Sequence, residues 1–351
     1  MNTGLVPTID IGRKIGRDHR PFVIAEVSAN HLGRMDRAIA IIDAAADAGC
    51  DAVKLQTFTP SSMTLESNQG DFHIPDGPWK GRSLWDLYDE AHTPWEWHAP
   101  LFAHAAARDL IIFSTPFDEE SVTRLDELGA PAFKIASFEL VDLELIRAAA
   151  RTNKPLIIST GMASDAEVAE AIETARTAGN GGVALLHCIS GYPAPIAQTN
   201  LRRMEALAKY GTVMGISDHS AGAVVPIAAV ARGASIIEKH LTLSRADGGP
   251  DAGFSLEPAE MTEVVRNCEL AWSALGDGSS KRPRAEDGSR RFRRSLYAAV
   301  DIAEGQELTR SNVRSIRPGF GLPPRELPNV IGKSAKVMIA RGTPLAWELI
   351  G

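Results

Sequence analysis

Two lysines, Lys54 and Lys134, each stand at the end of a short apolar run. Two cations that face one cavity suit an anion, and phosphate is the common choice. Hydroxyl side chains occupy matching places at Thr115, Ser137 and Ser159. Hydroxyls there can donate to phosphate oxygens, although capping of a strand end explains any one of them equally well. Together the five groups predict a cradle for phosphate.

Two histidines, His219 in Ser-Asp-His-Ser and His240 in Glu-Lys-His-Leu, end two consecutive apolar runs later in the chain. Neighbouring strands lie ~4.8 Å apart, so histidines at equivalent strand ends can share one divalent metal ion. With two protein nitrogens and oxygen ligands from substrate or water, such a site is open and catalytic. Mn2+, Co2+, Mg2+ and Zn2+ all suit it. The competing interpretation is a pair of core hydrogen-bonding histidines, and His187 is a weaker third candidate.

Three carboxylates complete the set of candidate residues. Glu26 and Glu139 lie near the ends of the first and fourth runs, where one can bind a hydroxyl or amide and one can handle a proton. Asp251 lies in a glycine-rich loop after His240, and its competing role is that of a turn former.

The elements that must position these groups are eight short apolar runs, most of them followed by a stretch with helical periodicity. They begin at Phe22, Ala52, Ile111, Ala132, Leu156, Val183, Val213 and Ser235. Eightfold strand–helix alternation predicts a (β/α)8 or TIM barrel, an α/β fold whose active site lies at the carboxyl ends of the strands. Residues 8–20 predict a hairpin that caps the bottom of the barrel. Residues 34–48 predict the first helix, with Gly49 as its C-cap.

The chain is predicted to divide into a barrel over residues 1–275, a polar, glycine-rich linker over 276–292 and a small β-rich module over 293–351. The segment 59–92 is long for a strand–helix connection. The length of this segment predicts a functional lid or specificity loop, and the alternative is an insertion without a function.

The composition excludes several classes of function. A net charge of −7 gives no reason to expect nucleic-acid binding. The longest apolar stretches are shorter than the ~20 residues that span a bilayer, and the first seven residues lack a secretory signal. Three widely spaced cysteines suit reduced thiols, so a cytoplasmic protein is expected.

Several of these runs, in their order along the chain, resemble motifs of the sialic acid synthase family. They include Ile24-Ala-Glu-Val-Ser-Ala-Asn-His, Val53-Lys-Leu-Gln-Thr-Phe, Phe133-Lys-Ile-Ala-Ser-Phe-Glu, Ser217-Asp-His and Ile237-Glu-Lys-His. The linker and tail resemble the antifreeze-like (SAF) domain of that family, so the likeness covers essentially the whole chain. The closer likeness is to the branch that makes pseudaminic acid, in segments that begin at Trp79, Ala91, Leu243 and Ser315. Ser190 stands where N-acetylneuraminate synthases typically carry Asn.

The resemblance implies condensation of phosphoenolpyruvate with 2,4-diacetamido-2,4,6-trideoxy-L-altrose, giving a nine-carbon 2-keto acid for flagellin or surface polysaccharide. Lys54, Lys134 and the three hydroxyls would hold phosphoenolpyruvate, and His219 and His240 would bind the metal, Mn2+, Co2+ or Mg2+. The sugar site would be lined by Glu26, Gln56, Tyr192 and Asp251. Glu139 would handle a proton.

The resemblance also implies that Arg317 of the antifreeze-like domain reaches the sugar in the barrel of a second subunit, in a domain-swapped homodimer. Reach within one chain and a solvated strand-end charge are the alternatives for this arginine. Legionaminic acid or N-acetylneuraminate synthase is the nearest competing function. A lysine Schiff-base aldolase without metal and a non-enzymatic ice- or glycan-binding protein are more distant ones.

Overall fold

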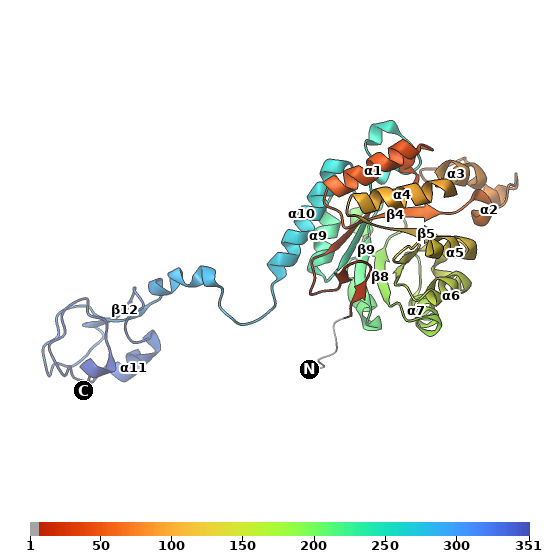
Figure 1. The fold of residues 1–351 in the computed structure, drawn as a ribbon. Coiled ribbons are helices and arrows are strands. Elements are labelled where there is room, and N and C mark those ends of the chain that lie inside the picture. The colour runs from red at the N-terminus through yellow and green to blue at the C-terminus, as the bar shows by residue number, and fades with distance from the viewer. Residues whose placement is uncertain (1–6) are drawn as a thin grey trace. The chain divides into compact units, whose positions relative to one another are not determined.

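The computed structural model describes residues 7–351. These residues divide into two compact units, of which the first ends at Gly276 and the second begins at Asp277. Residues 1–6, within the stretch judged to lack a secretory signal, lie outside the described residues. The first unit is a closed barrel of eight parallel strands, ringed by helices (Figure 1). The predicted fold class is therefore confirmed.

The strands follow one another around the barrel in chain order, and β10 closes it by pairing with both β9 and β3. They are β3 (Phe22–Glu26), β4 (Ala52–Thr57), β5 (Ile111–Pro116), β6 (Phe133–Ile135), β7 (Leu156–Ser159), β8 (Val183–Cys188), β9 (Val213–Ser217) and β10 (Ile236–His240). Each strand begins within one residue of its predicted start.

Eight helices connect the strands or follow the last one, and they cover the outside of the barrel (Figure 1). They are α1 (Met35–Asp47), α4 (Trp95–Ala107), α5 (Glu119–Glu127), α6 (Leu143–Arg151), α7 (Asp165–Ala178), α8 (Arg203–Leu207), α9 (Val224–Ala231) and α10 (Pro258–Leu275). The first matches its predicted range closely: Ala48 is its C-cap, and Gly49 follows with φ 83°. A positive φ is what glycine accepts readily after a helix.

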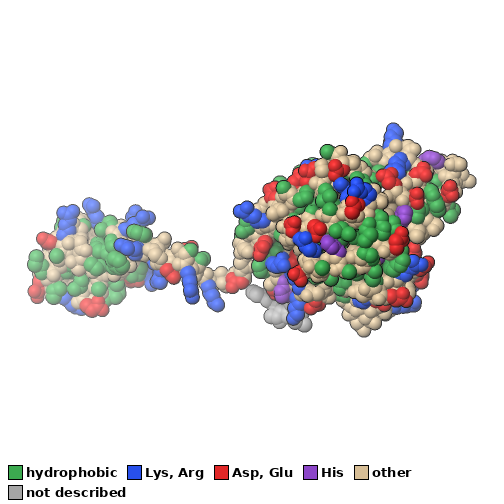
Figure 2. Space-filling model, turned by 45° about the horizontal axis from the view of Figure 1, so that its top comes forward, with side chains coloured by type: hydrophobic (Ala, Val, Ile, Leu, Met, Phe, Trp, Pro, Cys, Tyr) green, Lys and Arg blue, Asp and Glu red, His purple; other side chains and the backbone are tan. Residues whose placement is uncertain are grey.

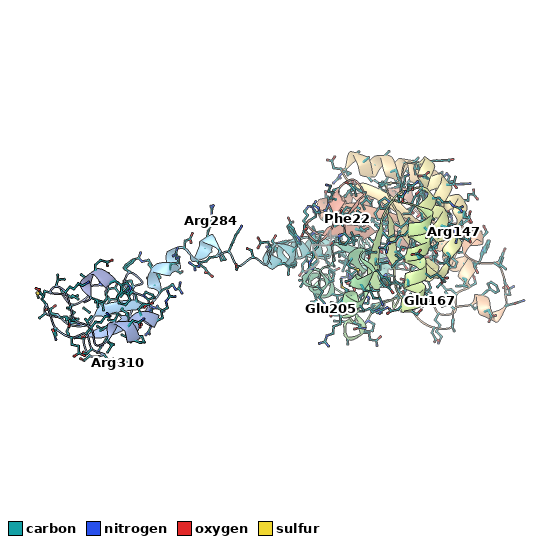
Figure 3. All side chains as sticks on the ribbon, turned by 90° about the horizontal axis from the view of Figure 1, so that it is seen from below. Phe22, Arg147, Glu167, Glu205, Arg284 and Arg310 are labelled. Carbon is teal, nitrogen blue, oxygen red and sulfur yellow. The ribbon has the colours of Figure 1, made fainter. Side chains whose placement is uncertain are left out.

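Alternation along each strand sorts its side chains between the barrel interior and the outer helices. Phe22 and Ile24 pack with Phe113 and Ile157 in an apolar plug inside the lower barrel. Glu26 is the next inward position after Ile24, so the same alternation carries a carboxylate into the interior above the plug. In Figure 3, Phe22 lies within the ring of strands, whereas Arg147 and Glu167 lie on the outer helices α6 and α7.

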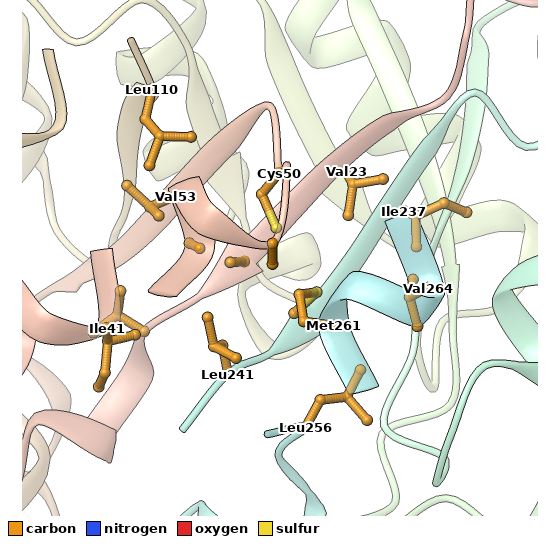
Figure 4. Packing of buried hydrophobic residues seen from close by; sticks show 14 of the residues in the cluster. Val23, Ile41, Cys50, Val53, Leu110, Ile237, Leu241, Leu256, Met261 and Val264 are labelled. Carbon is orange, nitrogen blue, oxygen red and sulfur yellow. The ribbon is translucent and has the colours of Figure 1, made fainter. Parts of the chain in front are cut away.

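The outward positions form a second apolar layer between strands and helices. Val23, Val53 and Ile237 pack with Ile41 of α1 and Met261 of α10 (Figure 4). A corresponding layer joins β6, β7 and β8 to helices α5, α6 and α7. Each strand is thus buried on both faces, as expected of a parallel barrel.

The predicted hairpin at the bottom of the barrel is present as the antiparallel pair β1 (Ile9–Asp10) and β2 (Lys14–Ile15). Ile9 and Ile15 pack against the interior plug, which confirms that the hairpin caps the barrel. Asp51 anchors it, because its carboxylate accepts from Arg13 Nε at 3.0 Å and from the Val23 backbone N–H at 2.9 Å.

The segment 59–92 is folded rather than irregular. It contains the short helices α2 (Pro60–Met63) and α3 (Leu84–Ala91), and an isolated bridge pairs His73 with Ser83. Trp79 Nε1 donates to Pro250 O at 2.8 Å, which ties the segment to the loop after β10.

The second unit has its own apolar core, which includes Leu296, Ile302, Leu308 and Ile339. Its one two-stranded sheet pairs β11 (Ser295–Ala298) with β12 (Val313–Ile316), and a short helix, α11 (Leu327–Val330), follows. The rest of the predicted β-rich module pairs only through isolated bridges, such as Ile302 with Ile339 and Glu307 with Ser334. Glycines with positive φ at 305, 332 and 342 interrupt the extended backbone there.

Residues 276–292, between α10 and β11, are all exposed. They contain two 3-10 turns, Arg284–Glu286 and Gly288–Phe292. On the face in Figure 2, basic and acidic side chains are interspersed over the barrel unit. Within residues 7–351, no helix has the length and apolar character needed to cross a bilayer.

Candidate active site

Lys54 lies inside the barrel and is paired with a carboxylate. Its Nζ forms an ion pair with Glu26 Oε2 from the neighbouring strand β3, and it donates to Thr115 Oγ1 of β5 at 2.9 Å. All three side chains are buried. Glu26 Oε1 accepts in turn from the Ser28 backbone N–H at 2.9 Å. Side chains of three adjacent strands therefore meet in one polar cluster that contains Lys54 and Thr115. The prediction that Lys54 ends its strand was wrong, because β4 continues past it to Thr57.

Lys134 stands on β6, separated from β4 by β5, in a similar arrangement. Its Nζ donates to Ser159 Oγ at 2.7 Å and lies 3.9 Å from Glu238 Oε1. Glu238 also accepts from Ser217 Oγ at 2.9 Å. Glu238 was not among the predicted site residues. The alternation of side chains along a strand could have identified it. Glu238 and His240 are two residues apart in β10, so they must share the inward face of the barrel. Lys239, which lies between them in the sequence, contacts Asp218 instead.

The four buried charged groups, Lys54, Glu26, Lys134 and Glu238, shift one another's pKa values. Burial opposes the charged form of Lys54, but the Glu238 and Glu26 carboxylates outweigh it and raise its pKa. Burial raises the pKa of Glu26, against the attraction of Lys54. Burial also disfavours ionised Glu238, yet Lys134 and Lys54 hold its pKa below the ordinary value. Burial lowers the pKa of Lys134. Opposite charges thus balance inside the barrel, where an unpaired charge would be costly.

His219 and His240 lie together at the mouth, with ring centroids 5.3 Å apart. His240 ends β10 as predicted, whereas His219 stands two residues beyond the end of β9. His219 Nδ1 lies 3.1 Å from Ile189 O, which leaves its Nε2 for another ligand. His240 Nδ1 is buried without a hydrogen-bond partner among residues 7–351. Burial and nearby cations lower the pKa of His240 and keep it neutral, the form that binds metals.

The donor set therefore suits a divalent metal held by two imidazoles, with the remaining ligands from substrate or water. No cluster of three or more histidine, cysteine or carboxylate residues in the described part of the chain is arranged to hold a metal. His187 does not join the pair, because alternation along β8 places it on the outward face with Leu185, where its Nε2 lies 2.6 Å from Thr199 O.

A cavity of about 420 Å³ opens at this end of the barrel. Its polar end contains Gln56, Glu139, Tyr192, His240 and Asp251. Its wall is apolar, and much of it comes from the segment 59–92, through Met63, Ile74, Trp79, Leu84, Leu87 and Tyr88. Phe254 completes the wall and contacts Tyr192 and His240, at centroid distances of 5.1 and 5.0 Å.

Ser28 connects three predicted site residues at the polar end, two through its hydroxyl and one through its backbone N–H. Ser28 Oγ accepts from Gln56 Nε2 at 3.0 Å and donates to Asp251 Oδ2, while its backbone N–H binds Glu26. Ser28 lies in the motif that begins at Ile24 but was not among the predicted site residues. Its position two residues after Glu26 was the available signal.

Glu139 lies on the 3-10 turn after β6 and faces the same cavity. Its Oε2 is buried without a partner among residues 7–351, and burial raises its pKa to about 7. A carboxyl that titrates near neutrality suits proton transfer. Ser137, just before this turn, accepts from the Gly161 backbone N–H at 3.1 Å. Arg317 lies exposed in the second unit, and its contact with sugar stays a prediction.

A closed β/α barrel whose strand ends carry paired lysines, histidines and carboxylates defines an enzyme with its active site at the barrel mouth. The model of the NeuB family matches residues 41–280, and that of the SAF domain matches residues 293–350. The chain belongs to the NeuB family, which confirms the resemblance seen in the sequence.

Proteins similar to this chain include two named as pseudaminic acid synthases and one named as an N-acetylneuraminic acid synthetase. The pseudaminic acid synthase of Helicobacter pylori is 40% identical over 330 residues, covering 93% of this chain and 97% of that protein. The pseudaminic acid synthase of Campylobacter jejuni is 41% identical over 329 residues, covering 93% and 96%. The crystal structure of N-acetylneuraminic acid synthetase from Leptospira borgpetersenii matches with a TM-score of 0.74 and 32% identity, covering 82% of this chain and 96% of that one.

The pairing of Lys134 with Glu238 yields a stability prediction. Lys134→Met leaves a buried carboxylate without its nearest cation, so we expect the free energy of unfolding to fall by about 3–5 kcal/mol. The double variant Lys134→Met with Glu238→Leu removes both charges and should recover most of that loss. Denaturant unfolding followed by circular dichroism measures both. A double variant no more stable than the single one would contradict the pairing.

The pKa of Glu139 yields a prediction about pH. Its folded pKa of about 7 lies above its ordinary value of 4.5, so the stability it contributes is complete below pH 4.5 and is lost as pH rises through 7. Glu139→Gln cannot ionise and keeps its stability. The melting temperature of Glu139→Gln minus that of the wild type should therefore increase as the pH rises from 5 to 8. Glu263→Gln, on the exposed face of α10, is the control. A difference that does not vary with pH would refute the assignment.

Proposed function

We propose that this enzyme is a pseudaminic acid synthase, which condenses phosphoenolpyruvate with 2,4-diacetamido-2,4,6-trideoxy-L-altrose to give a nine-carbon 2-keto acid and phosphate. The names of its relatives support the coarser class, a synthase of nonulosonic acids. The observation that carries the proposal is a two-lysine anion cradle inside the barrel beside a sugar-sized cavity, the two being linked through Ser28, which lines the cavity and whose backbone N–H bonds the Glu26 partner of Lys54.

The cradle suits phosphoenolpyruvate. Lys54 and Lys134 would hold its anionic groups, and Thr115, Ser137 and Ser159 would donate hydrogen bonds to them. The incoming anion competes with Glu26 and Glu238 for the lysines. Both lysines serve as cations, because the substrate is already an activated enol and requires no Schiff base.

The cavity suits the proposed sugar better than a more hydroxylated one. Two acetamido methyl groups and the methyl at C6 are apolar, and Trp79, Leu87 and Tyr88 offer apolar surface to receive them. The sugar hydroxyls would face Gln56 and Asp251 at the polar end. N-acetylmannosamine has hydroxyls at C4 and C6 and would leave them against an apolar wall without partners.

In the proposed reaction, the enol carbon of phosphoenolpyruvate bonds to the aldehyde carbon of the open-chain sugar. Water then adds at C2, and phosphate leaves by cleavage of the C–O bond. Glu139, with a pKa near neutrality, would hold or move the proton of that water. The lysines would stabilise the departing phosphate.

His219 and His240 would hold a divalent metal, Mn2+, Co2+ or Mg2+. When bound, it would supply Lewis-acid polarisation of the aldehyde oxygen. His240 Nδ1, buried without a partner among residues 7–351, supports this assignment. We further propose that Arg317 reaches the sugar in the barrel of a second copy, in a domain-swapped dimer that works in the cytoplasm.

One competing function has an observation in its favour. Burial lowers the pKa of Lys134, as a Schiff-base lysine requires. Its hydrogen bond to Ser159 and its proximity to Glu238 favour instead a lysine that stays charged. Borohydride reduction in the presence of pyruvate traps a Schiff base if one forms, and we expect no covalent adduct by mass spectrometry.

Phosphate release from phosphoenolpyruvate, with Mn2+ or after chelation, tests the proposal with three sugars in parallel. They are the altrose derivative, its 2,4-diacetamido mannose-series counterpart and N-acetylmannosamine. We expect metal-dependent release with the altrose derivative and at least about tenfold lower kcat/KM with the other two. Preference for another sugar would move the enzyme to the legionaminic or N-acetylneuraminate branch. No release with any sugar would refute the synthase.

A further inference from the structure

Ser28 has an unusual backbone conformation at the polar end of the cavity. Its φ is 47°, in the left-handed region that favours glycine, and its side chain is only 3% exposed. A residue with a Cβ is strained there, at a cost of order 1–3 kcal/mol. Glycine would satisfy the backbone with less strain. The presence of serine therefore points to its hydroxyl.

That hydroxyl lies at the centre of a short network. It accepts from Gln56 Nε2 at 3.0 Å and donates to Asp251 Oδ2. Gln56 comes from β4 and Asp251 from the loop after β10, so Ser28 joins two parts of the barrel that are far apart in sequence. Ser28, Gln56 and Asp251 all line the cavity.

The rest of the network fixes the orientation of Asp251. Ser255 Oγ donates to Asp251 O at 2.7 Å, and Asn30 Nδ2 donates to Ser255 Oγ at 2.9 Å. These bonds hold the backbone of the loop, whereas the carboxylate itself accepts from the Ser28 hydroxyl and from the backbone N–H of Ala29. Without the hydroxyl, the carboxylate and the Gln56 amide lose the bridge that sets their relative positions.

We propose that Ser28 is a positioning residue for the sugar: its hydroxyl holds the Asp251 carboxylate as an acceptor and the Gln56 amide as a donor for adjacent sugar hydroxyls. This assignment rests on the proposed function, because it assumes that the sugar occupies the polar end of the cavity. It concerns the sugar alone, since the lysine cradle touches Ser28 only through the backbone N–H that binds Glu26.

Two substitutions separate the hydroxyl from the backbone. Ser28→Ala removes the hydroxyl and keeps the strain, while Ser28→Gly removes both. We expect Ser28→Gly to melt at a higher temperature than Ser28→Ala. We expect KM for the sugar to rise about tenfold in both, with KM for phosphoenolpyruvate unchanged. A residue that served only the fold would show the opposite, with Ser28→Gly recovering activity along with stability.

The control is Asp109→Gly, an exposed residue with φ 56° that follows α4 and lies outside the cavity. It should leave both KM values at the wild-type level. Kinetics use whichever of the three sugars the wild type turns over. An active wild type whose Ser28→Ala variant keeps its sugar KM overturns the role of Ser28 alone. A wild type inactive with all three sugars overturns the proposed function, and this assignment with it.

Discussion

The pairing of two buried lysines with two buried carboxylates is the constraint on which the rest of this site depends. Lys54 and Lys134 can stay charged inside a barrel because Glu26 and Glu238 lie beside them. The strands impose this arrangement, since the same alternation that fills the lower barrel with apolar side chains brings charged ones into the interior above it. The interior is thus built in two levels, an apolar plug and an ionic cradle.

The balance of charge in the cradle has a consequence for binding. An anion that enters finds lysines already engaged by carboxylates, so it must replace one favourable ion pair by another rather than gain a new one outright. The exchange favours a ligand with several negative charges and good hydrogen-bonding geometry, such as a phosphate ester that also carries a carboxylate. The neighbouring hydroxyls of Thr115 and Ser159 already bond the lysines and can turn to such a ligand.

Under the proposed function, specificity for the sugar would lie in different elements from the cradle. The strand ends supply the polar end of the cavity, while the folded segment 59–92 supplies much of the apolar wall. Trp79 joins the two, because its indole N–H bonds the backbone of Pro250 next to Asp251. A change of sugar can therefore be accommodated in the segment without disturbing the ionic centre, as is common for loops on a barrel scaffold.

The sequence was sufficient to predict the barrel, because its strand signals repeat eight times and each ends in a polar group. Lys54 and Thr115 bond each other, as do Lys134 and Ser159, whereas Lys54 lies within β4 rather than at its predicted end. Glu238 was missed because it was viewed as part of a histidine motif rather than by its inward register. Ser28 was missed because a positive φ leaves no mark on a serine in sequence. The fold of 59–92 depends on tertiary contacts such as that of Trp79, which local patterns do not encode.

The most direct test of the ionic cradle is the affinity for phosphoenolpyruvate alone, measured by isothermal titration calorimetry. Wild type and the doubly neutral variant, Lys134→Met with Glu238→Leu, differ by one cation and one anion and so keep the same net charge. We expect wild type to bind and the folded double variant to lose at least about tenfold in affinity. Equal affinity in the two proteins would contradict the assignment of the buried lysines as the site of the anion.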